Sequence, residues 1–148
     1  MKVLSTGIVP GGDVGFLYRP FRALELFASL TDKQVYQVLY GVRTLEYAKG
    51  EVIFRRGDPG DAFFVVQTGR VEARVPGFLG FSRVVGRMGP GEFFGELAML
   101  LRQPRAATAV CAERTVVHSL SWPDLDGLMR KNPDIAAAIN AAVAKRSR

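Results

Sequence analysis

Residues 47–73, YAKGEVIFRRGDPGDAFFVVQTGRVEA, decide the fold class. Short runs of valine, isoleucine and phenylalanine alternate there with turn residues at Lys49-Gly50, at residues 57–60 and at Thr68-Gly69. Runs of the same kind, separated by turns at intervals of roughly 8–12 residues, fill residues 42–121. This spacing is typical of antiparallel sheets, so the sequence predicts a jelly-roll-like antiparallel β-roll of about eight strands.

The segment before the roll has a different pattern. Residues 1–19 are rich in glycine and show no periodicity, so we interpret them as an N-terminal arm or linker. Apolar residues with helical spacing predict a helix over residues 20–30. Thr31 and Gln34 form a capping box, which predicts a second helix that ends near Tyr40.

Two further helices are expected after the roll. Ser121 can cap a helix that runs to Lys131, and Pro133 suits the first position of a final helix. The fold class predicted is therefore mainly β with flanking helices. One domain spans residues 20–148, with N-terminal helices in 20–41, the roll in 42–121 and C-terminal helices in 122–148.

Composition excludes several function classes. The chain has 148 residues, of which 48% are apolar and 23% charged, as in an ordinary globular domain. A single cysteine, Cys111, fits a reducing compartment, so we expect a cytoplasmic protein. No apolar run approaches the roughly 20 residues of a membrane span, and we expect no membrane insertion. The net charge of +6 is scattered along the chain, so we also expect no nucleic-acid partner.

No catalytic constellation is present in the sequence. A lone histidine, His118, and a lone cysteine cannot build the usual zinc site. Residues 89–95, GPGEFFG, miss the spacing of a dinucleotide-binding loop by one residue. We therefore expect no enzyme activity, no metal and no cofactor.

A hairpin loop at residues 76–81, PGFLGF, is unusually apolar. Phe78, Leu79 and Phe81 occupy positions where solubility favours polar residues. Either these side chains fold back onto the roll, or they form a contact site for a partner or a second copy.

The run FFGELAMLLRQPRAAT, residues 93–108, holds a single acid, Glu96, among apolar residues and an arginine, Arg105, between a proline and two alanines. Glu96 and Arg105 could form a structural ion pair. Alternatively, Glu96 could accept a hydrogen bond from a sugar hydroxyl while the guanidinium of Arg105 pairs with a phosphate.

The residues around these charges suit an anion. A short helix beginning at Gly95 would present unpaired N–H groups at its N-terminus. Ala106 and Ala107 leave their backbone N–H groups accessible. The run therefore favours a site for a compact sugar phosphate.

The runs GPGEFFGELAML (residues 89–100) and QPRAATAV (residues 103–110) resemble the phosphate-binding cassette of cyclic-nucleotide-binding domains. Such domains occur in catabolite activator proteins, regulatory subunits of protein kinase A and cyclic-nucleotide-gated channels. The resemblance covers about residues 21–144 and includes the glycine-punctuated strands of residues 47–73.

The resemblance implies a role for each residue of the cassette. Glu96 would accept the ribose 2′-hydroxyl, and Arg105 would pair with the cyclic phosphate. The cradle would be completed by backbone N–H groups of Gly95, Leu97, Ala98, Ala106 and Ala107.

The resemblance also bears on the base. Relatives selective for cGMP often carry threonine after the arginine, and Ala106 at this position favours cAMP, with cGMP possible. Val71, Ala73 and Val75 could flank the purine, although one face of their strand must belong to the core. Ile139, Asn140 and Val143 of the final helix could form a lid over the base or could simply pack against the domain.

The function implied is a regulatory domain that binds cAMP and relays binding through movement of its terminal helices. The alternative is a degenerate fold that serves as a protein–protein interaction module without a ligand. The output would require a linked effector domain or a homo-oligomer.

Overall fold

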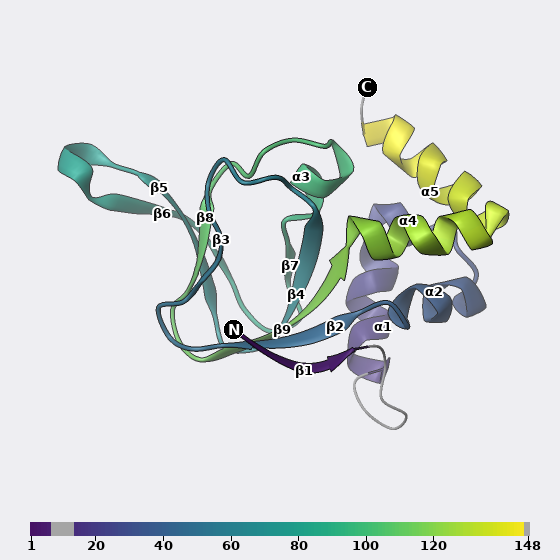
Figure 1. Ribbon diagram of the computed structural model, residues 1–148, viewed down its shortest axis with the longest axis horizontal. Coiled ribbons are helices and arrows are strands. Elements are labelled where there is room, and N and C mark those ends of the chain that lie inside the picture. Colours follow the sequence, from purple (N-terminus) through teal and green to yellow (C-terminus); the bar gives the residue numbers. More distant parts are fainter. Residues whose placement is uncertain (7–13, 147–148) are drawn as a thin grey trace.

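The structure, a computed structural model, describes residues 1–6 and 14–146 (Figure 1). Within these residues, two antiparallel sheets form the roll, with strand orders β1-β2-β9-β4-β7 and β3-β8-β5-β6. The strands are β1 (Lys2–Thr6), β2 (Arg43–Tyr47), β3 (Val52–Phe54), β4 (Ala62–Thr68), β5 (Val71–Pro76), β6 (Ser82–Met88), β7 (Phe93–Phe94), β8 (Thr108–Cys111) and β9 (Thr115–Ser121). Strands β2 to β9 lie within residues 42–121, so the predicted fold class is confirmed.

Helices gather at one end of the roll, and the β5–β6 hairpin projects from the other end (Figure 1). Short α3 lies beside the roll, and its Met99 and Leu100 belong to the core cluster that the other helices share. The helical elements are α1 (Val14–Ala23), η1 (Glu25–Phe27), α2 (Asp32–Leu39), η2 (Phe78–Gly80), α3 (Glu96–Leu100), α4 (Trp122–Lys131) and α5 (Pro133–Arg146).

The interpretation of residues 1–19 as an arm is wrong at both described ends. Lys2–Thr6 forms strand β1, which pairs antiparallel with β2 from Lys2 opposite Glu46 to Thr6 opposite Arg43. Residues 14–19 belong to α1, and residues 7–13 lie outside the described part. Five residues are too few to show a periodic pattern, and β1 forms because the free edge of β2 offers unpaired backbone groups.

The helix predicted over residues 20–30 has the wrong limits. Helix α1 begins at Val14 and runs through Pro20 to Ala23, and a separate turn, η1, follows. Proline has no N–H donor and usually stands near a helix start, so a helix that continues through Pro20 is unexpected. Here the apolar face of α1 is buried against the roll, and this packing sustains the helix across Pro20.

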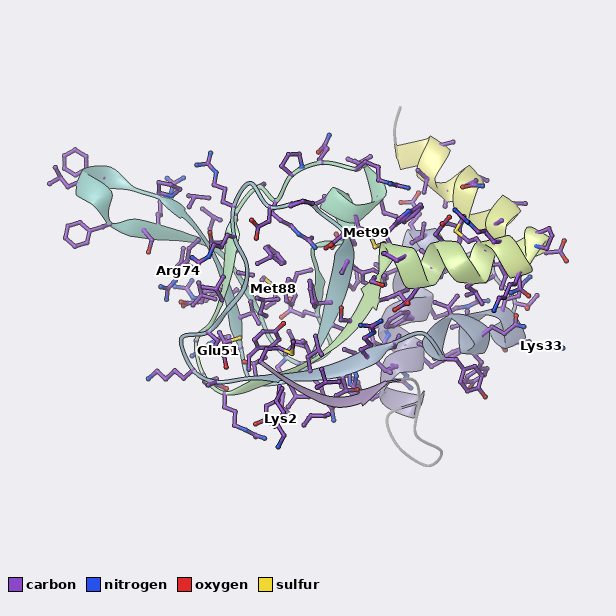
Figure 2. All side chains as sticks on the ribbon, in the orientation of Figure 1. Lys2, Lys33, Glu51, Arg74, Met88 and Met99 are labelled. Carbon is purple, nitrogen blue, oxygen red and sulfur yellow. The ribbon has the colours of Figure 1, made fainter. Side chains whose placement is uncertain are left out.

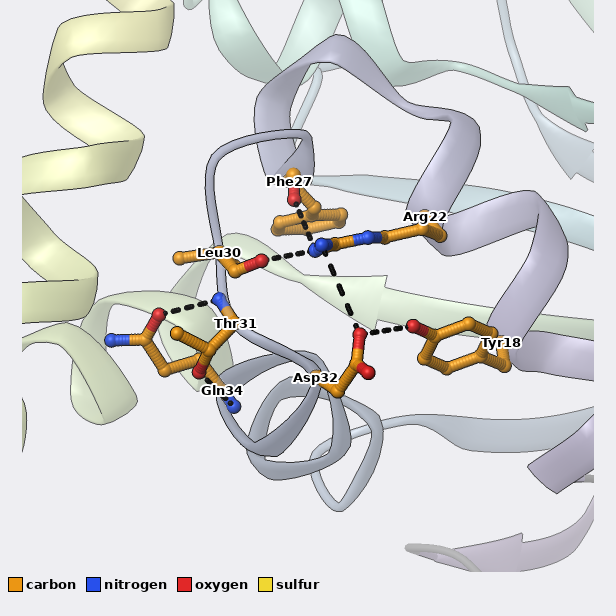
Figure 3. Close-up of polar contacts among 7 residues, drawn as sticks. All are labelled: Tyr18, Arg22, Phe27, Leu30, Thr31, Asp32 and Gln34. Carbon is orange, nitrogen blue, oxygen red and sulfur yellow. Dashed lines mark hydrogen bonds and ion pairs between the residues drawn. The ribbon is translucent and has the colours of Figure 1, made fainter.

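Side chains of α1 fasten it to the next turn and helix (Figure 3). The guanidinium of Arg22 donates hydrogen bonds to the carbonyl oxygens of Phe27, at 3.3 Å, and of Leu30. The hydroxyl of Tyr18 donates to a carboxylate oxygen of Asp32 at the start of α2. The carbonyl of Phe27 also accepts from the N–H of Leu30 at 3.2 Å, so these contacts connect α1 to the turn after η1 and to the start of α2.

The helix starts predicted after residue 30 are confirmed. Thr31 N–H donates to Oε1 of Gln34 at 2.8 Å, and Gln34 N–H donates to Oγ1 of Thr31 at 3.2 Å, which completes the capping box. Ser121 Oγ accepts from the N–H of Asp124 at 3.2 Å. Pro133 occupies the first position of α5.

Two clusters make up the core. One joins the helices to the roll, where Phe63 of β4 lies with its ring centroid 5.4 Å from that of Phe21 and 6.1 Å from that of Phe27. The other lies between the two sheets and includes the stacked rings of Phe64 and Phe94. Met88 lies within the roll, whereas Met99 lies toward the helices (Figure 2).

The apolar residues of the 76–81 loop do not fold back onto the roll. Phe78, Leu79 and Phe81 are all exposed, so that interpretation is wrong.

Candidate functional site

A pocket of about 330 Å³ opens between α3 and the roll. All seven residues proposed for the cassette line it: Gly95, Glu96, Leu97, Ala98, Arg105, Ala106 and Ala107. The remaining wall comes from Phe54, Ala73, Met88, Phe93, Phe94 and Ala109. A larger hollow of about 600 Å³ lies elsewhere, between α2 and α4, and none of the proposed residues lines it.

Gly95 allows α3 to begin at the pocket wall. It has a φ of +82°, in the left-handed region that glycine adopts most readily. A Cβ at this position would lie 2.7 Å from Nη1 of Arg105, so the missing side chain also makes room for the guanidinium. The sequence prediction that the short helix begins here agrees with the structure.

The first turn of α3 leaves donors at the pocket. The N–H of Met99 bonds to the carbonyl of Gly95, so the N–H groups of Glu96, Leu97 and Ala98 precede the first bond of the helix. Across the pocket, the N–H groups of Ala106 and Ala107 donate to no backbone oxygen within the described part of the chain. Two sets of backbone donors thus border the same space.

Arg105 is a buried cation, with 4% of the residue exposed. Its Nη1 donates to the carbonyl of Gly95 at 2.8 Å and its Nη2 to the carbonyl of Ala62 at 2.5 Å. The guanidinium carbon lies 4.1 Å from the ring centroid of Phe54, in cation–π contact. Nε is buried and has no hydrogen-bond partner among the residues that the structure describes.

The charge of Arg105 is therefore incompletely compensated. Burial lowers the pKa of Arg105, and the more distant charges of Asp61, Asp58 and Glu96 oppose this shift. No carboxylate oxygen among the described residues lies within 4.0 Å of the guanidinium. A desolvated cation without a paired anion is costly, and an anion in the pocket would relieve that cost.

The structural ion pair between Glu96 and Arg105 is not formed. Glu96 is half-buried in the first turn of α3, and Arg105 contacts backbone carbonyls and aromatic rings instead. Because the two side chains border one pocket without pairing, the ion-pair interpretation is wrong for this structure.

The backbone of Arg105 is fixed by the loop between β3 and β4. Its N–H donates to the carbonyl of Asp58, and its carbonyl accepts from the N–H of Gly57, both at 2.8 Å. Gly60 of the same loop packs so tightly on α3 that a Cβ there would lie 2.5 Å from the Cβ of Ala98. The loop thus sets the position of both halves of the cassette.

Sequence reasoning missed part of the apolar wall. Phe54 and Met88 line the pocket, and neither was proposed. Of the strand residues considered for the purine, Ala73 lines the pocket, Val71 is buried between the sheets, and Val75 does not line it. The alternation of residues along β5 showed that these three side chains share one face of the strand. It did not show whether that face belongs to the core or to the pocket.

The final helix provides no lid in this structure. Ile139 is fully buried in the helical cluster, Asn140 is exposed, and Val143 packs against that cluster. Helix α5 packs against η1 and α4, and none of its described residues lines the pocket. Plain packing, the other interpretation of this helix, is the one observed.

The described residues meet the requirements of neither a metal site nor a membrane span. Among the described residues, no group of three or more His, Cys, Asp and Glu side chains could hold a metal ion. None of the helices described is long and apolar enough to cross a membrane.

The sequence and the fold of the chain match those of known proteins. The family model for the cyclic nucleotide-binding domain matches residues 44–132. The cyclic AMP receptor protein of Thermus thermophilus is 34% identical over 123 residues, which are 83% of this chain and 57% of the relative. A cyclic nucleotide-gated potassium channel of Mesorhizobium japonicum is 31% identical over 97% of this chain and 39% of its own length. The chain thus spans only part of these relatives.

A solved structure agrees. The regulatory domain of Toxoplasma gondii PKA, in a co-crystal with cAMP, is 31% identical with a TM-score of 0.71, over 79% of this chain and 44% of that chain. With a family model that matches residues 44–132 and a fold that matches as well, the chain belongs to the cyclic nucleotide-binding domain family.

Proposed function

We propose that this chain is a regulatory domain that binds cAMP in the pocket beside α3. The observation that carries the proposal is the buried, incompletely compensated guanidinium of Arg105. A cyclic phosphate carries one negative charge and fits the fork of donors that arginine presents. Calorimetric titration with cAMP and with cGMP tests the proposal, and cAMP should bind the more tightly.

The rest of the pocket supports the same ligand. Glu96 lies at the N-terminus of α3, where its carboxylate can accept a hydrogen bond from the ribose 2′-hydroxyl. Ala106 carries no hydroxyl that could bind the exocyclic amine of guanine, which favours adenine. The apolar wall of Ala73, Met88 and Ala109 suits a purine. The Thermus relative named as a cyclic AMP receptor protein and the cAMP co-crystal of the Toxoplasma domain support this choice.

A degenerate interaction module explains the pocket less well. Without a ligand, the desolvated cation of Arg105 and the two sets of free backbone donors would only lower the stability of the fold. We also propose that the domain works in the cytoplasm, catalyses no reaction, needs no cofactor and binds no nucleic acid. Its output would pass to a linked effector domain or a second copy, since the chain spans only part of its relatives.

A relay from the pocket to the helices would begin at Arg102. This residue lies between α3 and Arg105, and its guanidinium carbon lies 4.0 Å from the ring centroid of Trp122, the first residue of α4. The N–H of Trp122 donates to the carbonyl of Asp61 at 2.6 Å. A ligand that draws α3 and Arg105 together would move Arg102, and with it the start of α4, if it binds the moved state more tightly.

The variant Arg102→Ala tests this relay. We expect cAMP affinity to change by no more than about 1 kcal/mol, because an exposed cation–π contact is worth roughly that much. The change in amide hydrogen exchange that cAMP causes in α4 and α5 should become smaller than in the parent. Arg130→Ala removes an exposed arginine of α4 and serves as the control. An unaltered exchange response in Arg102→Ala would contradict the relay.

A further inference from the structure

The hairpin of β5 and β6 ends in an exposed apolar tip. Phe78, Leu79 and Phe81 are 84%, 78% and 75% exposed, and they lie at the end of the hairpin that projects from the roll (Figure 1). Three such side chains together form an apolar patch of roughly 400–500 Å², a size at which exposed patches are commonly functional.

Backbone hydrogen bonds fix the conformation of the tip. The N–H of Gly77 donates to the carbonyl of Phe81 at 2.6 Å, and the N–H of Phe81 donates to the carbonyl of Phe78 at 3.1 Å. Leu79 has a φ of +55°, a left-handed conformation that is unfavourable for leucine. The tip is therefore a closed turn of defined backbone conformation, on which the three apolar side chains are exposed.

Positive charge accompanies the tip. Between residues 70 and 88 the chain carries four arginines and a single acid, Glu72. That acid pairs with Arg74 at 2.5 Å and with Arg87 at 3.7 Å. Arg83, two residues beyond Phe81, is exposed and forms no ion pair within the described part of the chain. The hairpin thus combines an apolar tip with a net positive charge on strands β5 and β6.

We propose that this tip docks on a lipid bilayer that contains anionic lipids. Phe78, Leu79 and Phe81 enter the interface between headgroups and acyl chains, and Arg83 remains among the anionic headgroups. A bilayer accepts a convex tip without a complementary shape. A stable protein interface buries about 800 Å² on each partner, roughly twice what these three side chains supply. The expectation of no membrane insertion rested on the lack of a spanning run, which this mode of contact does not need.

Vesicle sedimentation with the full chain, without nucleotide, tests the proposal. The protein should sediment with phosphatidylcholine vesicles that contain phosphatidylserine, and at least about tenfold less with vesicles of phosphatidylcholine alone. The double variant Phe78→Ser/Phe81→Ser should lose at least about tenfold in apparent affinity. Arg83→Gln should weaken binding to the anionic vesicles, as should added salt. Tyr40→Ser, which removes an exposed aromatic residue far along the chain, should bind like the parent.

A fluorescent variant separates insertion from surface adsorption. The emission that Phe81→Trp adds to that of Trp122 in the parent should shift to the blue with anionic vesicles, because the new ring leaves water. Failure of the parent to sediment with anionic vesicles, or equal binding by the double variant, would overturn the proposal. A third outcome would also overturn it. If the parent does not bind vesicles and the double variant has a lower molar mass than the parent by light scattering, the tip joins two copies of the chain instead.

Discussion

Replacing Arg105 with alanine should weaken cAMP binding by roughly 2–5 kcal/mol, because a desolvated phosphate would lose its charged partner. Arg105 is the only cation that lines the pocket among the described residues, so no neighbour can take its place. Calorimetric titration of parent and variant measures the loss. Arg105→Lys should bind between the two, since an ammonium keeps the charge but lacks the planar fork of donors.

The matched control for this variant is Arg56→Ala. Arg56 is exposed in the loop after β3 and does not line the pocket, yet its loss changes the net charge equally. This variant should keep its affinity for cAMP. Because Arg105 also donates to the carbonyls of Gly95 and Ala62, thermal unfolding of each variant must show an intact fold. Parent-like affinity in folded Arg105→Ala would contradict the assigned phosphate contact.

Glu96→Gln should weaken cAMP binding by roughly 1.5–3 kcal/mol, the range for a hydrogen bond to a charged group. The loss should be larger for cAMP than for 2′-deoxy-cAMP, because only cAMP carries the hydroxyl that the carboxylate accepts from. Titration of parent and variant with both nucleotides gives the coupling as a double cycle.

Glu113→Gln provides the control for this cycle. Glu113 is an exposed acid in the turn between β8 and β9, away from the pocket lining, and its neutralisation changes the net charge equally. It should bind both nucleotides like the parent. Equal losses of cAMP and 2′-deoxy-cAMP in Glu96→Gln would refute the ribose role and leave only a general electrostatic effect.

Local signals in the sequence predicted local structure well. The capping box of Thr31 and Gln34 and the cap at Ser121 depend on bonds across three residues, and both form as expected. Helix α3 begins at Gly95, where the backbone takes a left-handed conformation that glycine adopts most readily. These features are determined by neighbours along the chain, so one sequence suffices to find them.

Features that depend on distant contacts were not predicted. Strand β1 exists because β2 offers a free edge, and α1 continues through Pro20 because its apolar face packs on Phe63 and its neighbours. Phe54 joins the pocket because β3 and β8 pair and turn it toward Arg105. Each of these contacts joins residues that are far apart in the sequence, so the local pattern of residues does not indicate it.

The proposed site is a set of seven residues that all line one pocket. Its seven residues lie on two short segments, and the resemblance to the family supplied both segments at the right distance. The structure adds what the sequence lacked: Glu96 and Arg105 border one pocket without pairing, and α5 stands apart from it. Plain packing, one of the two interpretations left open for the final helix, is the one that the structure shows.

Isothermal titration calorimetry of the unaltered protein with cAMP tests the central claim most directly. We expect saturable binding with a Kd in the micromolar range or tighter, which corresponds to about −8 kcal/mol or better. cGMP should bind more weakly under the same conditions. If neither nucleotide produces heat, or a chemical-shift change, at roughly millimolar concentration, the binding energy would be below about 4 kcal/mol and the claim that the pocket is a cAMP site would be wrong.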